Sequence, residues 1–391
     1  MQLKIYKTNW KKVRLGDVAT EYSKRIDNPS KSKFERFVGS SNIGQWDFRI
    51  QSWESTDSVT SSMKLFEPND YLLVRRSLYA SDFRERAPRA TFGGVCSGDI
   101  LTIKENPEML ADGFLIGILN SPSLWKYVVA NASGSITRRI KWKDLANYEF
   151  LLPPKDQQAQ LAELLWAMDE VIERELDALE KLDLTYTALI EKTLINKDAS
   201  KLFFSDLLKV VRGVGYEPDQ LLDNYDDKTY IILRSNNISN SVINYLDVKF
   251  LSAESVKKEQ KLIEGDFAIC MSNGSKELVG KAAEYIDYGK NVSIGSFCAC
   301  LRPFSKENKI LVKHLLNSES YRYAIKSILT GSAINNLKPS DIEGVFFRVD
   351  INQIKKGLLN KLEFMYENKS ALGTNILNSK SLQKSLINQI F

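Results

Sequence analysis

The chain repeats itself at a constant offset of 197 residues. Asn120-Ser121 returns as Asn317-Ser318, and Phe150 returns as Phe347. Solenoid proteins repeat every 20–50 residues or so, which is far shorter than this period. The offset therefore indicates one globular unit followed by a long helix, present twice. Such a chain is pseudo-symmetric, and we expect its ligand to be nearly symmetric too.

Each half mixes strands and helices. Short apolar runs at 71–74, 100–103 and 150–152 are bounded by turn residues and predict strands, while 111–131 predicts a helix. Residues 198–350 restate this frame. With 391 residues there is material for two cores of ordinary size, and the expected class is α+β.

Long helices follow both globular segments. No proline or glycine interrupts residues 157–197, and apolar side chains recur there in a heptad pattern that the tail repeats. Because the second domain begins where the first helix ends, the second helix can bury its apolar stripe only by running back along the first. This predicts two long antiparallel helices, a coiled coil joining two pseudo-symmetric globular domains. The side chains expected to pair the helices are Leu165, Met168, Leu179, Leu189, Leu362, Met365, Ile376 and Leu386. The predicted divisions are 1–152, 153–197, 198–350 and 351–391.

Charge is distributed unevenly along the chain. Residues 1–154 hold 23 basic and 17 acidic side chains, residues 155–197 hold 5 and 10, and residues 198–391 hold 26 and 22. Basic globular segments favour a polyanion, because neutralising phosphates releases counterions. The local two-fold symmetry of duplex DNA would suit a pseudo-symmetric protein.

Few residues or motifs in the sequence could support catalysis. His314 is the only histidine, and we expect a structural role for it. Cys298 and Cys300 are expected to be buried thiols, since two ligands do not make a zinc site. Phosphate-binding and dinucleotide-binding glycine motifs are absent. We therefore expect no catalytic residue, metal or cofactor. No apolar run approaches a membrane span, no secretory signal is evident, and cysteines are few, so a cytoplasmic protein without a membrane partner is expected.

Polar clusters in both halves suggest contacts with DNA. Arginine reads guanine edges, asparagine reads adenine, and lysine mostly holds phosphates. The candidate residues are Arg75, Arg76, Arg84, Arg86, Arg89, Arg138, Arg139, Lys141, Arg234, Asn236, Asn237, Asn273, Lys276, Asn335, Asn336 and Lys338. Ordinary solvated loops are the competing interpretation. Arg138-Arg139 in one half corresponds in the repeat to Asn335-Asn336 in the other. This difference favours the recognition of two different DNA sequences.

Several motifs together resemble the specificity subunit of type I restriction–modification systems. They are Leu151-Leu152-Pro153-Pro154 followed by Gln157-Gln158, and the Gly134-Ser135 and Gly331-Ser332 loops that enter Lys-x-x-Asp-Leu/Ile segments expected to be strands. The resemblance covers the whole chain. It departs at 349–353, where the double proline is missing.

The resemblance implies how such a chain would work. Two target recognition domains would each read half of a bipartite, asymmetric site in double-stranded DNA, and the helices would set the distance between the halves. Two DNA adenine methyltransferase subunits would dock on the helices, and a separate ATP-dependent subunit would cleave. The chain itself would perform no chemistry.

Two other functions remain open from the residues alone. A stand-alone metal-dependent nuclease would rely on Asp219, Asp247 and Lys249. A coiled-coil adaptor would bind only proteins.

Overall fold

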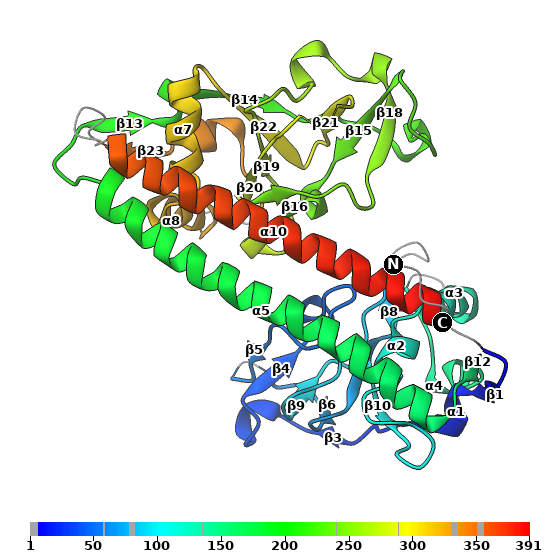
Figure 1. Ribbon diagram of the computed structural model, residues 1–391. Helices are drawn as coiled ribbons and strands as arrows, with labels where there is room; N and C mark the ends of the chain where they lie inside the picture. The colour runs from blue at the N-terminus through cyan, green and yellow to red at the C-terminus, as the bar shows by residue number, and fades with distance from the viewer. Residues whose placement is uncertain are drawn as a thin grey trace. The chain divides into compact units, whose positions relative to one another are not determined.

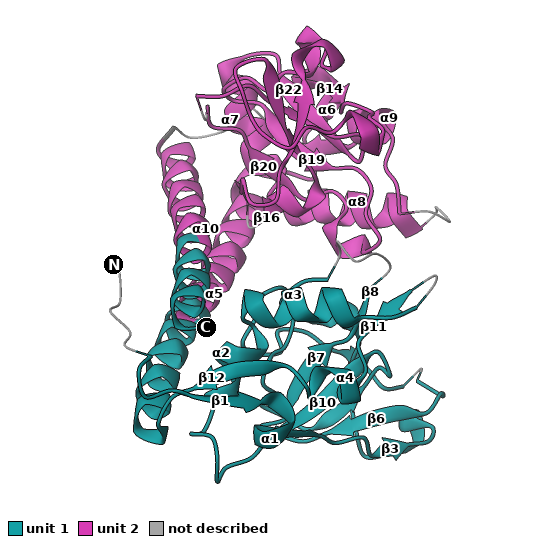
Figure 2. Ribbon diagram, turned by 90° about the vertical axis from the view of Figure 1, so that its right-hand side faces the viewer, with its two compact units in different colours: residues 1–173, 378–391 teal, residues 174–377 magenta. Residues whose placement is uncertain are grey.

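Strands and short helices alternate through both halves of the chain, and a long helix follows each half (Figure 1). The computed structural model describes residues 7–57, 59–77, 83–134, 137–239, 241–287, 289–330, 335–349 and 356–391. Two compact units divide the chain (Figure 2): unit 1 comprises residues 1–173 and 378–391, and unit 2 comprises residues 174–377.

The elements of the first half, with 3-10 helices labelled η, run in this order: β1 (Lys11–Arg14), α1 (Leu15–Val18), β2 (Ala19–Glu21), β3 (Arg25–Ile26), η1 (Pro29–Lys31), β4 (Arg36–Val38), η2 (Ser40–Asn42), β5 (Glu54–Ser55), β6 (Met63–Phe66), β7 (Tyr71–Val74), β8 (Arg76–Ser77), β9 (Gly94–Cys96), β10 (Ile100–Glu105), α2 (Leu115–Leu119), α3 (Pro122–Asn131), β11 (Arg138–Arg139), α4 (Trp142–Leu145), β12 (Glu149–Leu152) and the long α5 (Lys155–Leu194).

Those of the second half are β13 (Lys201–Phe203), α6 (Phe204–Leu207), β14 (Leu208–Arg212), η4 (Pro218–Gln220), β15 (Thr229–Leu233), η5 (Ser235–Asn237), β16 (Ile238–Ser239), β17 (Val242–Ile243), β18 (Lys249–Ser252), η6 (Ala253–Ser255), η7 (Lys258–Gln260), β19 (Phe267–Cys270), η8 (Lys276–Leu278), β20 (Ala282–Glu284), β21 (Val292–Ile294), β22 (Cys298–Pro303), α7 (Lys306–Leu315), α8 (Glu319–Thr330), α9 (Pro339–Glu343), β23 (Phe346–Arg348) and the long α10 (Lys356–Ile390).

Both units use the same sheet frame. In unit 1, β10 lies between β2 and β7 with antiparallel pairing, β4 pairs in parallel with β9, and β1 pairs with β12. In unit 2, β22 lies between β14 and β19, β15 pairs in parallel with β21, and β13 pairs with β23. The α+β class and the strands expected at 71–74, 100–103 and 150–152 are confirmed.

Each core includes side chains from both long helices. Leu165 of α5 and Leu386 of α10 belong to the core of unit 1. Tyr186 of α5 and Leu362 of α10 belong to the core of unit 2. The long helices are therefore part of each folded unit, because their apolar stripes also cover the apolar face of the neighbouring sheet and short helices.

Within unit 2 the two helices run antiparallel. Asp183 pairs with Lys369, and the Tyr186 ring lies beside the ring of Tyr366, so numbers rise along α5 while they fall along α10. The two-helix arrangement expected from the heptads is thus present in this unit.

The side chains predicted to pair the helices are all buried or partly buried in the two units. Leu165, Leu179, Leu362, Ile376 and Leu386 are buried. Met168, Leu189 and Met365 are partly buried against the same cores. Leu165, Leu362 and Leu386 thus pack into the cores of the units, and the pairing of the two helices through these side chains stays a prediction.

The start of α5 is fixed by a buried glutamine. Gln158 is 2% exposed; its Oε1 accepts a hydrogen bond from the N–H of Ala111 (2.9 Å), and its Nε2 donates to the carbonyl of Pro153 (2.9 Å). Trp10 donates from its indole to Gln157 (3.0 Å). The Gln157-Gln158 pair thus anchors the helix to the globular part of unit 1.

Two local expectations were wrong. The helix predicted over 111–131 is broken into α2 and α3 because Ser121 caps a new helix that begins at Pro122. The segments after Lys141 and Lys338 form the short helices α4 and α9 instead of strands. In α9, the Asp341 carboxylate accepts a hydrogen bond from the N–H of Lys338 (2.7 Å), which satisfies a helix end.

The described part of the chain contains no helix that is both long and apolar enough to cross a membrane.

Candidate nucleic-acid interface

Two arginine clusters of unit 1 come together on one short strand pair. Strands β8 and β11 pair so that Arg76 lies opposite Arg139 and Ser77 lies opposite Arg138. Asp99 accepts hydrogen bonds from Nη1 of Arg76 (2.7 Å) and from Nε of Arg139 (3.0 Å). Partial burial opposes ionisation of Asp99, but the two guanidinium groups outweigh it and hold the pKa of that carboxyl below its usual value.

Unit 2 joins its asparagine clusters in the same way. Ser272 lies opposite Asn336 in an antiparallel bridge, and the N–H of Asn273 donates to the carbonyl of Asn335 (3.4 Å). Nδ2 of Asn273 also donates to the hydroxyl of Ser235 (3.1 Å). Segments more than 60 residues apart in the sequence therefore form one polar surface.

The two glycine-serine loops lie largely outside the described residues. Gly134 is described and has a left-handed φ of 138°, whereas Ser135, Gly331 and Ser332 are not described.

Asn237 is not available for base contacts, which corrects the prediction. Its side chain is 0% exposed, accepts a hydrogen bond from the N–H of Arg234 (2.8 Å) and donates to the carbonyl of Leu246 (2.8 Å). Asn42 of unit 1 accepts from Gly39 at the same distance. Asn42 and Asn237 therefore stabilise equivalent turns in the two units and are not positioned to contact DNA bases.

The arginines of residues 84–89 differ in role. Arg86 donates to the carbonyl of Ser40 (3.3 Å), and burial together with Arg84 lowers its pKa. Arg89 is paired with the carboxylate of Asp112 and lies 3.6 Å from Glu105. Arg89 is thus bound to intramolecular carboxylates, and we assign it a structural role.

The remaining candidates lie nearer the surface. Arg75 and Arg84 are half-buried, whereas Arg138 and five other side chains are exposed: Arg139, Lys141, Asn236, Lys276 and Lys338. Arg234 is half-buried and donates to both the carboxylate (2.9 Å) and the carbonyl (2.7 Å) of Asp247.

That ion pair bears on the nuclease reading. Asp247 belongs to the turn held by Arg234, Asp219 lies in η4, and Lys249 begins β18. Among the residues that the structure describes, no three His, Cys, Asp or Glu side chains gather where they could hold a metal ion. The geometry gives this alternative no support.

His314 and the cysteines are buried in unit 2. Nδ1 of His314 lies 2.6 Å from the hydroxyl of Tyr186, and its Nε2 lies 2.9 Å from Glu363. Burial would raise the pKa of Glu363, but the hydrogen bonds from His314 and Lys313 outweigh it and hold that pKa at about 2. His314 thus joins α5, α7 and α10 of unit 2. Cys298 and Cys300 are buried thiols, as expected.

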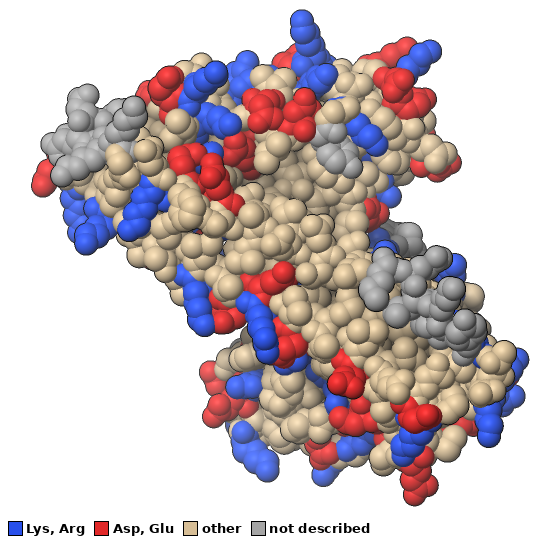
Figure 3. All heavy atoms as spheres, in the orientation of Figure 1, with Lys and Arg blue, Asp and Glu red and all other residues tan. Residues whose placement is uncertain are grey.

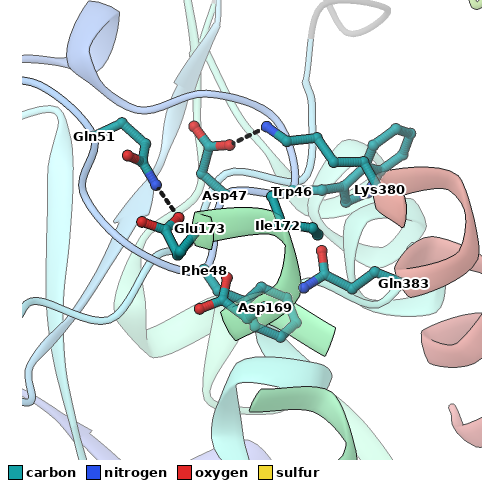
Figure 4. Close-up of a pocket in the computed structure, with 9 residues that line it drawn as sticks. All are labelled: Trp46, Asp47, Phe48, Gln51, Asp169, Ile172, Glu173, Lys380 and Gln383. Atoms are coloured by element: carbon teal, nitrogen blue, oxygen red, sulfur yellow. Dashed lines mark hydrogen bonds and ion pairs between the residues drawn. The ribbon is translucent and has the colours of Figure 1, made fainter. Parts of the chain in front are cut away.

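A loop of unit 1, residues 46–51, is attached to the long helices by polar contacts (Figure 4). Asp47 pairs with Lys380 of α10 (2.9 Å) in this view. Arg49 pairs with Asp169 of α5 (2.6 Å). Burial raises the pKa of Asp169 to about 6, against the opposing effect of Arg49. These contacts could not be predicted from the sequence, because their partners lie more than 100 residues apart.

Basic and acidic side chains are interspersed on the face drawn in Figure 3. Its described residues therefore do not present a uniformly basic surface there. A polyanion that bound this face would have to contact particular side chains, because net charge alone would not hold it there.

Known proteins resemble the chain in part. No protein-family model matches it. The type I restriction enzyme StySPI specificity subunit of Salmonella potsdam is 33% identical over 160 residues, which is 41% of this chain and 34% of that protein. The type I restriction enzyme EcoKI specificity subunit of Escherichia coli K12 is 34% identical over 140 residues, which is 36% and 30%. The match spans about a third of each relative's length, and it confirms the resemblance inferred from the motifs.

Two solved structures align with nearly the whole chain. The S subunit of a type I restriction–modification system from M. genitalium is 15% identical over 100% of this chain and 99% of that one, with a TM-score of 0.47. The HsdS subunit from Thermoanaerobacter tengcongensis is 16% identical over 98% and 97%, with a TM-score of 0.38. Both scores are below 0.5.

Proposed function

We propose that this chain is the DNA-recognition subunit of a type I restriction–modification complex and performs no chemistry itself. One observation carries the proposal: both units have the same backbone frame but display different polar side chains at equivalent places. Arg76 and Arg139 occupy these places in unit 1, whereas Ser272 and Asn336 occupy them in unit 2. A protein that recognises two different half-sites needs one backbone arrangement that carries different side chains in each domain. The names of the two sequence relatives support this reading.

Residues 1–152 and 198–350 would be the two target recognition domains. Segments 153–197 and 351–391 would be the helical parts that link them. DNA contacts are assigned to the candidate side chains that keep accessible polar atoms: Arg76, Arg138, Arg139, Lys141, Asn236, Asn273, Lys276, Asn335, Asn336 and Lys338. Arg75, Arg84, Arg86 and Arg234 would position the loops that carry them.

The partners would be double-stranded DNA and two DNA adenine methyltransferase subunits docked on the helices. Large apolar side chains that are exposed on both helices would supply apolar area for such docking. They are Leu164, Val171 and Leu184 on α5, and Phe364 and Leu382 on α10. A separate ATP-dependent subunit would supply cleavage, and the complex would act in the cytoplasm, where its DNA lies.

A selection experiment tests the proposal. The purified chain, alone and with its methyltransferase subunits, is used to enrich duplexes from a random-sequence library at several salt concentrations. We expect one bipartite motif with two unlike half-sites and a fixed gap, and an affinity that falls linearly with salt on logarithmic axes.

Other outcomes would support the alternatives. Failure to retain any duplex at any salt concentration, even with the methyltransferase present, would point to a protein adaptor. Magnesium-dependent cleavage by the chain alone, abolished by Asp247→Ala, would point to a nuclease. A single uninterrupted motif would contradict two separate reading domains.

A further inference from the structure

A backbone frame in unit 1 places three side chains next to each other. The N–H of Arg75 donates to the carbonyl of Asp99 (3.0 Å), and the N–H of Ile140 donates to the carbonyl of Arg75 (3.0 Å). These bonds hold the turn before β10 and the strand β11 on either side of residue 75. Arg76, Asp99 and Arg139 consequently meet at one point.

Unit 2 repeats this frame bond for bond. The N–H of Met271 donates to the carbonyl of Phe297 (2.8 Å), and the N–H of Leu337 donates to the carbonyl of Met271 (2.8 Å). Ser272 and Asn336 are paired as Arg76 and Arg139 are. Phe297 therefore occupies the place that Asp99 has in unit 1. The two residues are 198 positions apart, one more than the constant offset of 197.

The equivalence defines two sets of three side chains. The first triplet is Arg76, Asp99 and Arg139; the second triplet is Ser272, Phe297 and Asn336. Neither Asp99 nor Phe297 was identified from the sequence. The spacing between matched residues changes from 196 at Arg76 to 198 at Asp99, so a constant offset misses the pair.

The chemistry of the first triplet suits a guanine edge. Asp99 takes one hydrogen bond from each guanidinium group, while an arginine carries five donors, so further donors remain on both side chains. The carboxylate fixes the orientation of the two guanidinium groups and cancels part of their charge. Fixed forks favour bidentate binding to guanine O6 and N7, whereas the nearby carboxylate weakens attraction for a phosphate.

The second triplet carries no charge. Phe297 is 67% exposed, and Asn336 is exposed as well. The Asn336 side chain makes no hydrogen bond with the described residues, so its amide can both donate and accept. An amide suits N6 and N7 of adenine, and an aromatic ring suits the thymine methyl group.

We propose that the first triplet selects a G·C base pair in one half-site and that the second triplet selects an A·T base pair in the other. This inference rests on the proposed function and names the residues that decide its specificity. Phe297 and Asn336 are specificity residues, and Asp99 is a positioning residue for the two arginines.

Exchanging the triplet tests the proposal most sharply. The variant Arg76→Ser, Asp99→Phe, Arg139→Asn places the second triplet in the frame of unit 1. In the random-library selection with the full chain, one G·C position of one half-site should change to A·T, and the other half-site should stay the same. The original base pair should lose preference by about 5- to 150-fold, as expected for one bidentate contact.

Single substitutions with matched controls cover the case in which the exchanged chain does not fold. Arg139→Asn should relax one position of the first half-site. Lys143→Ala removes an exposed lysine of α4 that is not among the candidate DNA contacts, and it should leave that position unchanged. Phe297→Ala should relax one A·T position of the second half-site. Phe304→Ala removes a similarly exposed ring (59%) from the end of β22 and should not.

The outcomes separate this inference from the proposed function. If Arg139→Asn and Phe297→Ala weaken binding equally for all sequences, the triplets contact the DNA backbone and the inference is wrong, while the proposed function stands. The same holds if wild type enriches a bipartite motif in which the triplet variants change no position. If wild type enriches no motif at all, the proposed function fails, and the inference fails with it.

Discussion

Lys369 offers a direct test of how α5 and α10 pair in unit 2. Its side chain is 6% exposed, and its Nζ lies 2.5 Å from Oδ1 of Asp183 and 2.7 Å from Oδ1 of Asn317. Lys369 is a charged residue within the apolar heptad pattern of α10, yet its side chain is buried between the two helices. The ion pair joins the two helices at one register and no other.

The cost of Lys369→Ala can be worked out from its partners. Removing one member of a buried ion pair costs about 3–5 kcal/mol, since the other charge loses its partner. Asp183 keeps Arg322 at 2.8 Å and is a quarter exposed, which reduces the penalty. We expect a loss of about 2–4 kcal/mol. For a unit of roughly 200 residues, this lowers the melting temperature by roughly 5–15 °C.

Differential scanning calorimetry of the full chain measures this loss. Lys361→Ala, which removes an exposed lysine from the same helix, is the control and should stay within about 0.5 kcal/mol of wild type. A double-mutant cycle with Asp183→Ala should give a coupling energy of about 1–3 kcal/mol. Purely additive effects, or a Lys369→Ala variant as stable as the control, would refute the helix register described for unit 2.

Two further predictions concern unit 1. Gln158→Ala should lower stability by about 2–4 kcal/mol in urea unfolding, because buried backbone groups of Ala111 and Pro153 lose their partner; the exposed Gln160→Ala should change little, and equal effects would contradict the anchoring role. Asp169 faces Arg49, Glu173 and Asp47, and its folded pKa of about 6 exceeds its ordinary 3.8. The native state then binds more protons than the unfolded state, so this group's stabilising contribution is complete below about pH 4 and is lost as pH rises through 6. That loss amounts to about 3 kcal/mol. Asp169→Asn should therefore reduce the fall in stability between pH 4 and pH 7, and an unchanged profile would be evidence against a buried carboxyl.

The frame of this fold could be predicted because its signals are local or repeated. Strands β7, β10 and β12 follow from short apolar runs between turn residues, and α5 follows from about 40 residues without proline or glycine. The heptad positions Leu165 and Leu362, which the sequence assigns to helix pairing, are both buried. These features depend on neighbours within a few residues, so the sequence alone contains them.

Which polar side chains are accessible on that frame could not be predicted to the same extent. Asn237 looks like an exposed base reader in the sequence, but backbone groups of its own turn use its amide. Arg89 resembles its neighbouring arginines, yet Asp112 and Glu105 neutralise it from elsewhere in the chain. Whether a polar side chain is free depends on partners that only the folded chain brings near.

Mapping methylated bases in the DNA of cells that express the chain with its methyltransferase subunits tests the central claim most directly. Residues 1–152 are exchanged for the corresponding segment of a type I restriction enzyme specificity subunit, and the methylated motif is compared before and after. The account predicts that one half of the motif changes while the other half and the gap are kept. A change in both halves, or in neither, would contradict the claim that each unit reads its own half-site.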